Sequence, residues 1–336
     1  RVLALKADLY ANGGWALDLS ESICDRAMFH IDNAYYLPNV DVFGRVAKTH
    51  EVSHTAFRGF GGPQGMLVIE ELMDRIARSL SLPPEEVRAR NFYRGTGETA
   101  TTHYGQHIDD LRVERVWSAV LERAEFARRK EAVRAFNAAS ARIKRGLAVT
   151  PVKFGISFTA TFLNQAGAYV LVYRDGSAQV NHGGTEMGQG LHTKVLGVAM
   201  RELGLPAERV RVMKTQTDKV PNTSATAASA GADLNGAAVK DACVTLVTRL
   251  RDVAAEMLGC ASRDEVAYGS GRFTSREGSV RTWAEVVERA YMTQVQLAAT
   301  GYYRTPGIGY DRAAGRGKPF HYFAYGAAVA EVEVDA

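Results

Sequence analysis

The chain has 336 residues, of which 46% are hydrophobic and 23% are charged, and its formal net charge at pH 7 is +4. This length and composition are those of an ordinary globular protein with two or more packed units. The charge excess is small and spread along the chain, which excludes the basic footprint of a nucleic-acid-binding protein. No apolar run approaches the roughly 20 residues that a membrane-spanning helix needs.

The cysteines and histidines form no recognisable metal-binding pattern. Cys24, Cys243 and Cys260 lie far apart, with no CxxC pair, and the eight histidines show no HExxH spacing. The sequence therefore contains no zinc or iron–sulfur motif, and any metal would have to arrive already ligated by another group. The cysteines are expected to be free, buried thiols. Together with the lack of a secretory leader, they indicate a cytoplasmic protein.

The first part of the chain predicts strands followed by a run of helices. In chain order these are a strand at 1–18, a short helix at 21–31, a strand at 40–57, a helix at 66–80, a short helix opened by Pro83-Pro84, and two polar helices within 111–143. The last two helices are rich in arginine and glutamate, as expected of a solvated connector. The segment Lys144-Arg145-Gly146 is predicted to break the chain after them.

The second part alternates strands and helices. The predicted elements are strands at 148–158, 166–173 and 178–180, a helix at 191–203, a strand at 208–213, a helix at 233–259 and a strand at 327–336. A hairpin turn is signalled by Arg174-Asp175-Gly176-Ser177, and Gly204 is a typical residue after a helix. The alternation predicts an α+β (mixed α/β) fold with mixed sheets and packed helices. A final strand without an evident partner suggests an internal piece of a longer polypeptide.

Four polar, small-residue loops lie at junctions between predicted elements, at 57–64, 153–159, 182–190 and 221–231. Such loops are either ordinary turns or parts of a binding site on a rigid scaffold. The third loop contains His182-Gly-Gly-Thr-Glu-Met-Gly-Gln-Gly190, whose glycines let backbone N–H groups approach a ligand closely. It lacks both the lysine of a phosphate loop and the GxGxxG pattern, so it predicts a polar ligand of another kind.

Taken together, the loop sequences resemble the xanthine dehydrogenase/aldehyde oxidase family, in the part that binds the molybdenum cofactor. The matching segments are Thr55-Ala-Phe-Arg-Gly-Phe-Gly-Gly-Pro-Gln64, Lys153-Phe-Gly-Ile-Ser-Phe-Thr159, Asn164-Gln-Ala-Gly-Ala168, His182-Gly-Gly-Thr-Glu-Met-Gly-Gln-Gly-Leu-His-Thr-Lys194, Val220-Pro-Asn-Thr-Ser224 with Thr226-Ala-Ala-Ser229, Gly301-Tyr-Tyr-Arg-Thr-Pro306 and Pro319-Phe-His-Tyr-Phe323. They follow one another in order through essentially the whole chain. The resemblance implies two molybdopterin-binding domains, both incomplete: 1–145 with the helical connector, and 146–336.

The resemblance also implies a cofactor and its binding residues. In the family the glycine loop cradles a pyranopterin, and its dithiolene holds molybdenum, so the protein supplies no direct metal ligand. The cofactor-binding residues that it implies here are Arg58, Phe60, Gly188, Gln189, Ala228 and Ser229. Of these, Arg58 and Ala228 would lie next to the molybdenum. The family further implies [2Fe-2S] clusters, FAD and NAD on other domains or subunits, and a dimer of the whole assembly.

The family reaction is hydroxylation of an aromatic carbon next to nitrogen, with water as the oxygen source and electrons leaving through iron–sulfur clusters and flavin to NAD. Arg26 matches the catalytic arginine that binds the purine and stabilises the negative charge that builds on it. Phe60 and Phe158 match the two rings that sandwich the substrate. Beside them, Thr159 could donate a hydrogen bond to the substrate, and Ala227 matches a small pocket-lining residue.

Arg26 and the Lys153–Thr159 segment favour purines, hypoxanthine and xanthine, over aldehydes. Two alternatives stay open: a hydroxylase of aldehydes or other N-heterocycles, and a non-catalytic homologue. The family's catalytic glutamate lies in a Gly-Glu motif that has no equivalent before Ala336. Its Gly-Gly-Gln-Glu cofactor motif is also absent. Glu186 is not taken as the missing base, because it lies in the pterin loop.

Overall fold

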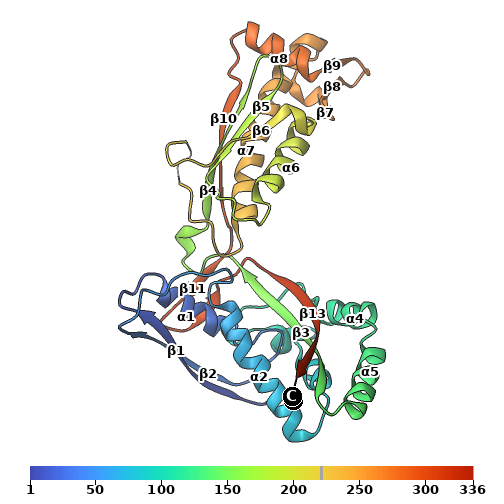
Figure 1. The fold of residues 1–336 in the computed structure, drawn as a ribbon. Coiled ribbons are helices and arrows are strands. Elements are labelled where there is room, and N and C mark those ends of the chain that lie inside the picture. The colour runs from blue at the N-terminus through green and yellow to red at the C-terminus, as the bar shows by residue number, and fades with distance from the viewer. Residues whose placement is uncertain (220–221, 336) are drawn as a thin grey trace. The chain divides into compact units, whose positions relative to one another are not determined.

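The computed structural model describes residues 1–219 and 222–335, and Figure 1 shows its course. Packing divides the chain into two compact units, residues 1–159 with 307–336, and residues 160–306. The predicted boundary between residues 145 and 146 lies inside the first unit and does not coincide with this division. As a boundary between family domains it stays a prediction.

The first unit combines three pairs of strands with five α-helices among its described residues. Its elements are β1 Leu5–Gly14, α1 Ser20–Phe29, β2 Val40–Lys48, α2 Gly62–Leu80, α3 Pro84–Asn91, α4 Val113–Arg123, α5 Phe126–Ala139, β3 Ile143–Ile156, β11 Gly309–Asp311, β12 Arg316–Lys318 and β13 Tyr322–Asp335. Strands β1 and β2 are parallel, β11 pairs with β12, and β3 and β13 form a long antiparallel ribbon. Helices α4 and α5 lie against this ribbon in Figure 1.

The ribbon corrects one sequence prediction and resolves another. Residues 144–146 do not break the chain, because β3 already begins at Ile143 and pairs there with Asp335. The last strand also begins earlier than predicted, at Tyr322, and its partner is β3. The strand thus gains its hydrogen bonds from a segment about 180 residues earlier, which local sequence patterns do not reveal.

An aromatic stack anchors the helices of the first unit. The rings of Tyr35 and Phe92 are stacked with centroids 5.9 Å apart, and Trp117 of α4 meets Phe92 edge-on at 5.2 Å. Ile69 and Met73 of α2 are buried in the same core. They are apolar residues of the periodic pattern that predicted this helix.

The second unit is a mixed four-stranded sheet with two helices packed on it and a small three-stranded sheet. Its elements are β4 Gln165–Val172, β5 Ala178–His182, α6 Leu191–Leu203, β6 Val210–Val212, α7 Gly231–Leu258, β7 Val266–Gly269, β8 Arg272–Ser275, β9 Val280–Thr282, α8 Trp283–Met292 and β10 Ala298–Arg304. The main sheet has the order β10-β4-β5-β6, and only β5 and β6 are parallel. Helix α7 lies along this sheet with α6 beside it (Figure 1). The predicted α+β class with mixed sheets is confirmed.

We expect Gly301→Ala to destabilise the second unit. A Cβ at Gly301 would lie 2.0 Å from the carbonyl oxygen of Ala238 and 2.5 Å from the amide nitrogen of Ala242, so α7 and β10 would have to separate. Overpacking of this kind costs about 1–3 kcal/mol. Native-state hydrogen exchange of β10 amides measures the loss. The matched control is Gly197→Ala in α6, which has open space and should be neutral or stabilising.

Candidate functional site

Arg26 is a buried cation in the last turn of α1, with 2% of its surface exposed. Its guanidinium donates hydrogen bonds to the carbonyl oxygens of Ser157, at 2.9 Å, and Gly155. The rings of Phe154 and Phe320 flank it at 4.8 and 5.1 Å. Burial lowers its pKa to about 10, so the group is charged at neutral pH. No carboxylate in the described part of the chain pairs with Arg26, and its Nε lacks a hydrogen-bond partner there.

Phe158 and Thr159 lie just beyond the end of β3, after Ser157. Phe158 is buried and Thr159 is half-buried. The preceding residue, Ser157, has a φ of 147°, and its hydroxyl donates to the carbonyl oxygen of Pro319 and accepts from the amide of His321. The backbone carbonyls that Arg26 contacts therefore lie directly before the predicted substrate-binding residues Phe158 and Thr159 in the chain.

The loop that carries Arg58 and Phe60 packs against α1 in the same unit. A Cβ on Gly61 would lie 2.0 Å from the carbonyl oxygen of Ile23, so loop and helix are in close contact there. Arg58 is exposed, and Phe60 is half-buried with a φ of 51°. A non-glycine residue in the left-handed region costs about 1–3 kcal/mol and is typical of functional loops.

Glu186 caps the glycine loop of the second unit. Its carboxylate accepts hydrogen bonds from the amides of Gly188 at 3.0 Å, Gly190 at 2.9 Å and His192 at 3.0 Å. These backbone donors, with that of His192 first, lower the pKa of Glu186. The carboxylate lies at the N-terminus of α6, where negative charge is favoured. Its oxygens are occupied by the loop itself.

Replacing Glu186 with glutamine should loosen this loop. The carboxylate contribution is present above the glutamate pKa of the unfolded chain and is lost as pH falls through the lowered pKa of the folded state. We therefore expect the amides of Gly190 and His192 to exchange faster in Glu186→Gln at pH 7, and the difference from wild type to shrink at acidic pH. Hydrogen exchange corrected for intrinsic rates measures this. An unchanged exchange rate at pH 7 would contradict the capping role.

Gln189 folds back on the same loop. Its side-chain oxygen accepts from the amide of Met187 at 2.6 Å, and its amide nitrogen donates to the carbonyl oxygen of Thr185 at 2.8 Å. The loop thus holds its shape through its own side chains. Gly188 has a φ of 89°, and a Cβ added there would meet no atom within 4 Å. The loop backbone at Gly188 is therefore open on that side.

The second loop of this unit carries Ala227, Ala228 and Ser229. The amide of Thr185 donates to the hydroxyl of Thr226 at 2.8 Å, which ties this loop to the glycine loop. Ala228 is buried and Ser229 is exposed, with left-handed φ values of 55° and 57°. The start of the matching segment, Val220-Pro221, lies outside the described residues.

Unpartnered polar atoms surround the glycine loop. Within the described residues, the buried atoms Asn181 Oδ1, His192 Nε2 and Thr223 Oγ1 have no hydrogen-bond partner. A buried polar atom left unpaired costs about 1–3 kcal/mol, so these atoms favour a ligand rich in hydrogen-bonding groups. A Cβ at Gly183 would lie 2.2 Å from the Thr223 hydroxyl, which explains the glycine at this close approach.

The predicted site residues therefore fall into two sets. Arg26, Arg58, Phe60, Phe158 and Thr159 lie in the first unit, on α1 and on two loops that pack around it. The second set, in the second unit, comprises Gly188, Gln189, Ala227, Ala228 and Ser229. The loops are thus brought together pairwise, 57–64 with 153–159, and 182–190 with 221–231. A single site formed by both sets stays a prediction.

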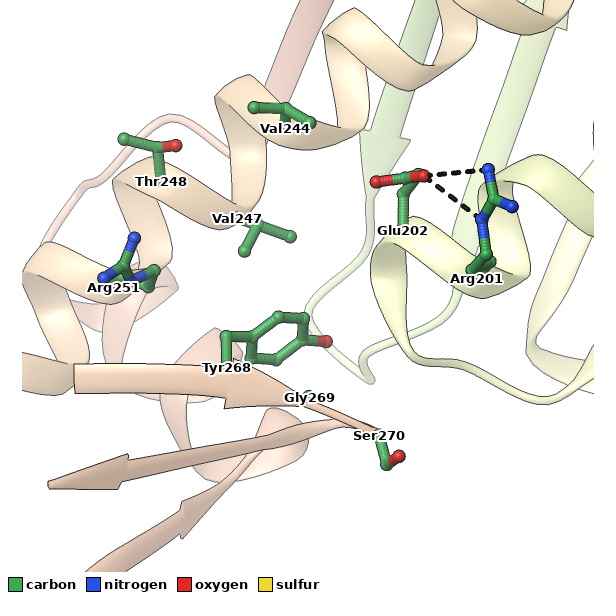
Figure 2. A pocket seen from close by; sticks show the side chains of 9 residues that line it. All are labelled: Arg201, Glu202, Val244, Val247, Thr248, Arg251, Tyr268, Gly269 and Ser270. Carbon is green, nitrogen blue, oxygen red and sulfur yellow. Dashed lines mark hydrogen bonds and ion pairs between the residues drawn. The ribbon is translucent and has the colours of Figure 1, made fainter.

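A separate pocket in the second unit contains none of these residues. Figure 2 shows the nine residues that line it: Arg201, Glu202, Val244, Val247, Thr248, Arg251, Tyr268, Gly269 and Ser270. Arg201 pairs with Glu202 at 3.3 Å, and Arg251 donates to two backbone carbonyls. Within the described chain, no lining side chain leaves a buried polar atom unpaired. The pocket therefore gives no indication of a ligand.

Sequence reasoning missed the buried polar residues behind Arg26. His30, Asp32 and Asn33 are each at most 1% exposed, and Lys153 is 1% exposed. Three of them hydrogen-bond the backbone or side chains of β3, as described below. The only sequence signal of His30, Asp32 and Asn33 is the cluster of polar residues at 30–33 after a short helix, whereas Lys153 opens a segment that matches the family. The described residues contain no group of histidine, cysteine or carboxylate side chains that could hold a metal ion.

Comparison with known proteins identifies the family. Family models described as molybdopterin cofactor-binding domain match residues 1–92 and 119–336. The chain therefore belongs to the molybdopterin cofactor-binding domain family, and the resemblance stated from the sequence is confirmed. It is similar to the xanthine dehydrogenase/oxidase of Gallus gallus, with 45% identity over 335 residues. Xanthine dehydrogenase of Oryza sativa subsp. japonica is also 45% identical over 335 residues. Each alignment covers 100% of this chain and 23% of the relative.

Solved structures show the same fold. The aldehyde oxidoreductase from Desulfovibrio gigas has a TM-score of 0.81 and 25% identity, covering 99% of this chain and 33% of that one. Quinoline 2-oxidoreductase from Pseudomonas putida 86 has a TM-score of 0.80 and 24% identity, covering 99% and 43%. Among the described residues, no helix has the length and apolar character to cross a bilayer.

Proposed function

We propose that this chain is the molybdenum-cofactor-binding part of an enzyme that hydroxylates purines, taking hypoxanthine to xanthine and xanthine to urate. The observation that carries the proposal is the 45% identity to xanthine dehydrogenases over 335 residues. The chain spans 23% of the length of these relatives, so the activity of the intact protein rests on this similarity. Two alternatives compete with this proposal: a hydroxylase of aldehydes or other N-heterocycles, and a homologue without catalytic activity.

The residues around the glycine loop fit a molybdopterin. A fused pterin ring presents many hydrogen-bonding edges, which suits the unpartnered atoms of Asn181, His192 and Thr223. Gly188, Gln189, Ala228 and Ser229 would hold the pterin in the second unit, and Arg58 and Phe60 are the proposed cofactor-binding residues of the first unit. When bound, the cofactor supplies the centre that transfers a water-derived oxygen and accepts two electrons. Because its pterin ligates the metal, no protein ligand is needed.

This chain's own residues would bind and polarise the purine. Arg26 is a buried cation that no carboxylate in the described chain neutralises, so its charge is available to stabilise negative charge on the ring. Phe60 and Phe158 would present flat faces to the heterocycle. Thr159 would donate to a ring oxygen, and Ala227 would leave room for the substrate. The general base, a glutamate in the family, is proposed to lie outside this segment.

The remaining parts of the reaction belong to the intact protein. We propose that [2Fe-2S] clusters and FAD on other domains or subunits pass the electrons to NAD, and that the assembly is a cytoplasmic dimer. These assignments rest on the family resemblance alone.

The test is the molybdenum content of the intact protein together with its steady-state turnover of xanthine and of an aromatic aldehyde. Stoichiometric molybdenum with a strong preference for xanthine supports the proposal. Molybdenum with a preference for the aldehyde keeps the cofactor assignment and overturns the purine assignment. A fully matured preparation without molybdenum would indicate the non-catalytic homologue.

A further inference from the structure

One edge of β3 is closed by side chains instead of by a strand. Its other edge pairs with β13 along its whole length. On the open edge, Asn33 donates to the carbonyl oxygen of Pro151 at 2.9 Å and accepts from the amide of Lys153 at 3.1 Å. His30 Nε2 accepts from the amide of Gly155 at 3.0 Å. Beyond them, Arg26 donates to the carbonyl oxygens of Gly155 and Ser157.

The spacing of these side chains matches the spacing of the strand. Residues 26, 30 and 33 are separated by four and three positions, so α1 and the turn after it present them on one side. Along β3, alternate residues direct their backbone groups to the same edge, and the bonded residues are 151, 153, 155 and 157. Three side chains thus take the place of a neighbouring strand, up to the residue before Phe158.

His30 is the central member of this row. An amide N–H can only donate, so Nε2 of His30 is the acceptor and the ring proton lies on Nδ1, 3.0 Å from the carbonyl oxygen of Arg26. The ring is 1% exposed and lies 4.8 Å from the ring of Phe154. Burial, followed by the charges of Arg26 and Lys153, lowers its pKa to about 3. One uncharged imidazole therefore bridges the helix backbone and the strand backbone.

We propose that His30 is a positioning residue of the purine site, because it fixes the α1 backbone at Arg26 to β3 and so sets the guanidinium against the strand end that carries Phe158 and Thr159. This inference rests on the proposed function. The bridge acts next to the guanidinium, since the Gly155 amide donates to His30 and the Gly155 carbonyl oxygen accepts from Arg26. Without the imidazole, the Gly155 amide is left buried and unpaired. The Gly155 carbonyl oxygen, to which the guanidinium donates, is then no longer held in place by His30.

The test compares three variants of the intact enzyme. His30→Leu removes both hydrogen bonds, and His30→Gln restores an acceptor at the Nε2 position. The matched control is Asn91→Leu in α3, which removes two hydrogen bonds of a buried amide in the same unit, to Val2 and Val87. A small displacement of a reacting group can cost about 100-fold in rate. We therefore expect His30→Leu to lower kcat for xanthine by about that factor and to change aromatic-aldehyde turnover by only a few-fold.

Three further results are expected. His30→Gln recovers much of the xanthine rate, Asn91→Leu leaves the ratio of xanthine to aldehyde turnover unchanged, and His30→Leu has little additional effect in an Arg26→Ala background. Equal losses for both substrates, or full additivity with Arg26→Ala, would show that His30 only stabilises the fold. Either result overturns the positioning role.

A readout independent of turnover separates this inference from the proposed function. Phenylglyoxal modifies accessible guanidinium groups, and Arg26 is 2% exposed in the chain. Peptide mass spectrometry should show Arg26 protected in wild type, in His30→Gln and in Asn91→Leu, but modified in His30→Leu. If the wild-type enzyme prefers aldehydes, the purine assignment is wrong, but the pattern of Arg26 protection still decides whether His30 holds Arg26 in place. Equal protection of Arg26 in wild type and in His30→Leu would refute the positioning role of His30.

Discussion

Arg26→Ala is expected to lower kcat/KM for xanthine in the intact protein by about 100- to 1000-fold, the usual loss when a fixed charge-stabilising group is removed. Turnover of an aromatic aldehyde should change by only a few-fold, because an aldehyde builds no comparable charge at that position. The physical reason is the environment of Arg26: buried, charged, and held by the neutral carbonyls of Gly155 and Ser157.

Arg26→Lys is the control for charge alone. Lysine keeps the positive charge but not the planar fork that reaches both carbonyls of β3. We expect an intermediate loss of xanthine turnover, with more of the deficit in kcat than in KM. Steady-state kinetics with both substrates distinguish the possibilities. Equal losses for xanthine and aldehyde in Arg26→Ala would mean that Arg26 is only part of the scaffold.

Sequence patterns predicted the elements that are determined locally. Helix α6 has the predicted bounds, Leu191–Leu203, and ends at Gly204 with a left-handed φ of 59°. The periodic apolar residues of α2 and the hairpin turn at 174–177 are likewise local features, and both are present. The motif residues of the candidate site were recognised for a different reason, because the family resemblance marks them directly.

Features that depend on pairing between segments far apart in the chain could not be predicted from the sequence. The start of β3 at Ile143 depends on a strand at the end of the chain. The division into units has the same cause, since β13 returns to the first unit. The hydrogen bonds of Arg26, His30 and Asn33 to β3 can be recognised only when the fold places β3 beside them. Charged residues such as Asp32 and Lys153 look like surface residues in a sequence, and their burial becomes visible only in the fold.

Asp32 and Lys153 form a buried ion pair under the candidate site. The ammonium of Lys153 lies 3.2 Å from the Asp32 carboxylate, and the two side chains are 1% and 0% exposed. Tyr93 donates to the same carboxylate at 2.6 Å, and His103 lies 3.6 Å away. Burial acts to raise the pKa of Asp32, but Lys153, His103 and Tyr93 outweigh it and leave the pKa below its ordinary value.

Lys153→Met should therefore destabilise the first unit strongly. Removing the ammonium leaves a buried carboxylate without its cationic partner, and breaking a buried pair in this way costs about 3–5 kcal/mol. The double variant Lys153→Met with Asp32→Leu should recover a large part of the loss, because both charges are then gone. Native-state hydrogen exchange of the β3 amides measures the opening free energy in each case. A single variant as stable as wild type would show that the pair contributes little.

The pH dependence gives an independent check on the same pair. Because the pKa of Asp32 is lowered in the folded chain, its contribution is present above about pH 4, the ordinary aspartate range, and is lost as pH falls through the folded value. The β3 amides of wild type should thus lose protection at acidic pH more steeply than those of the double variant. Parallel losses in both proteins would mean that Asp32 titrates alike in the folded and unfolded chain, which is incompatible with a strong buried pair.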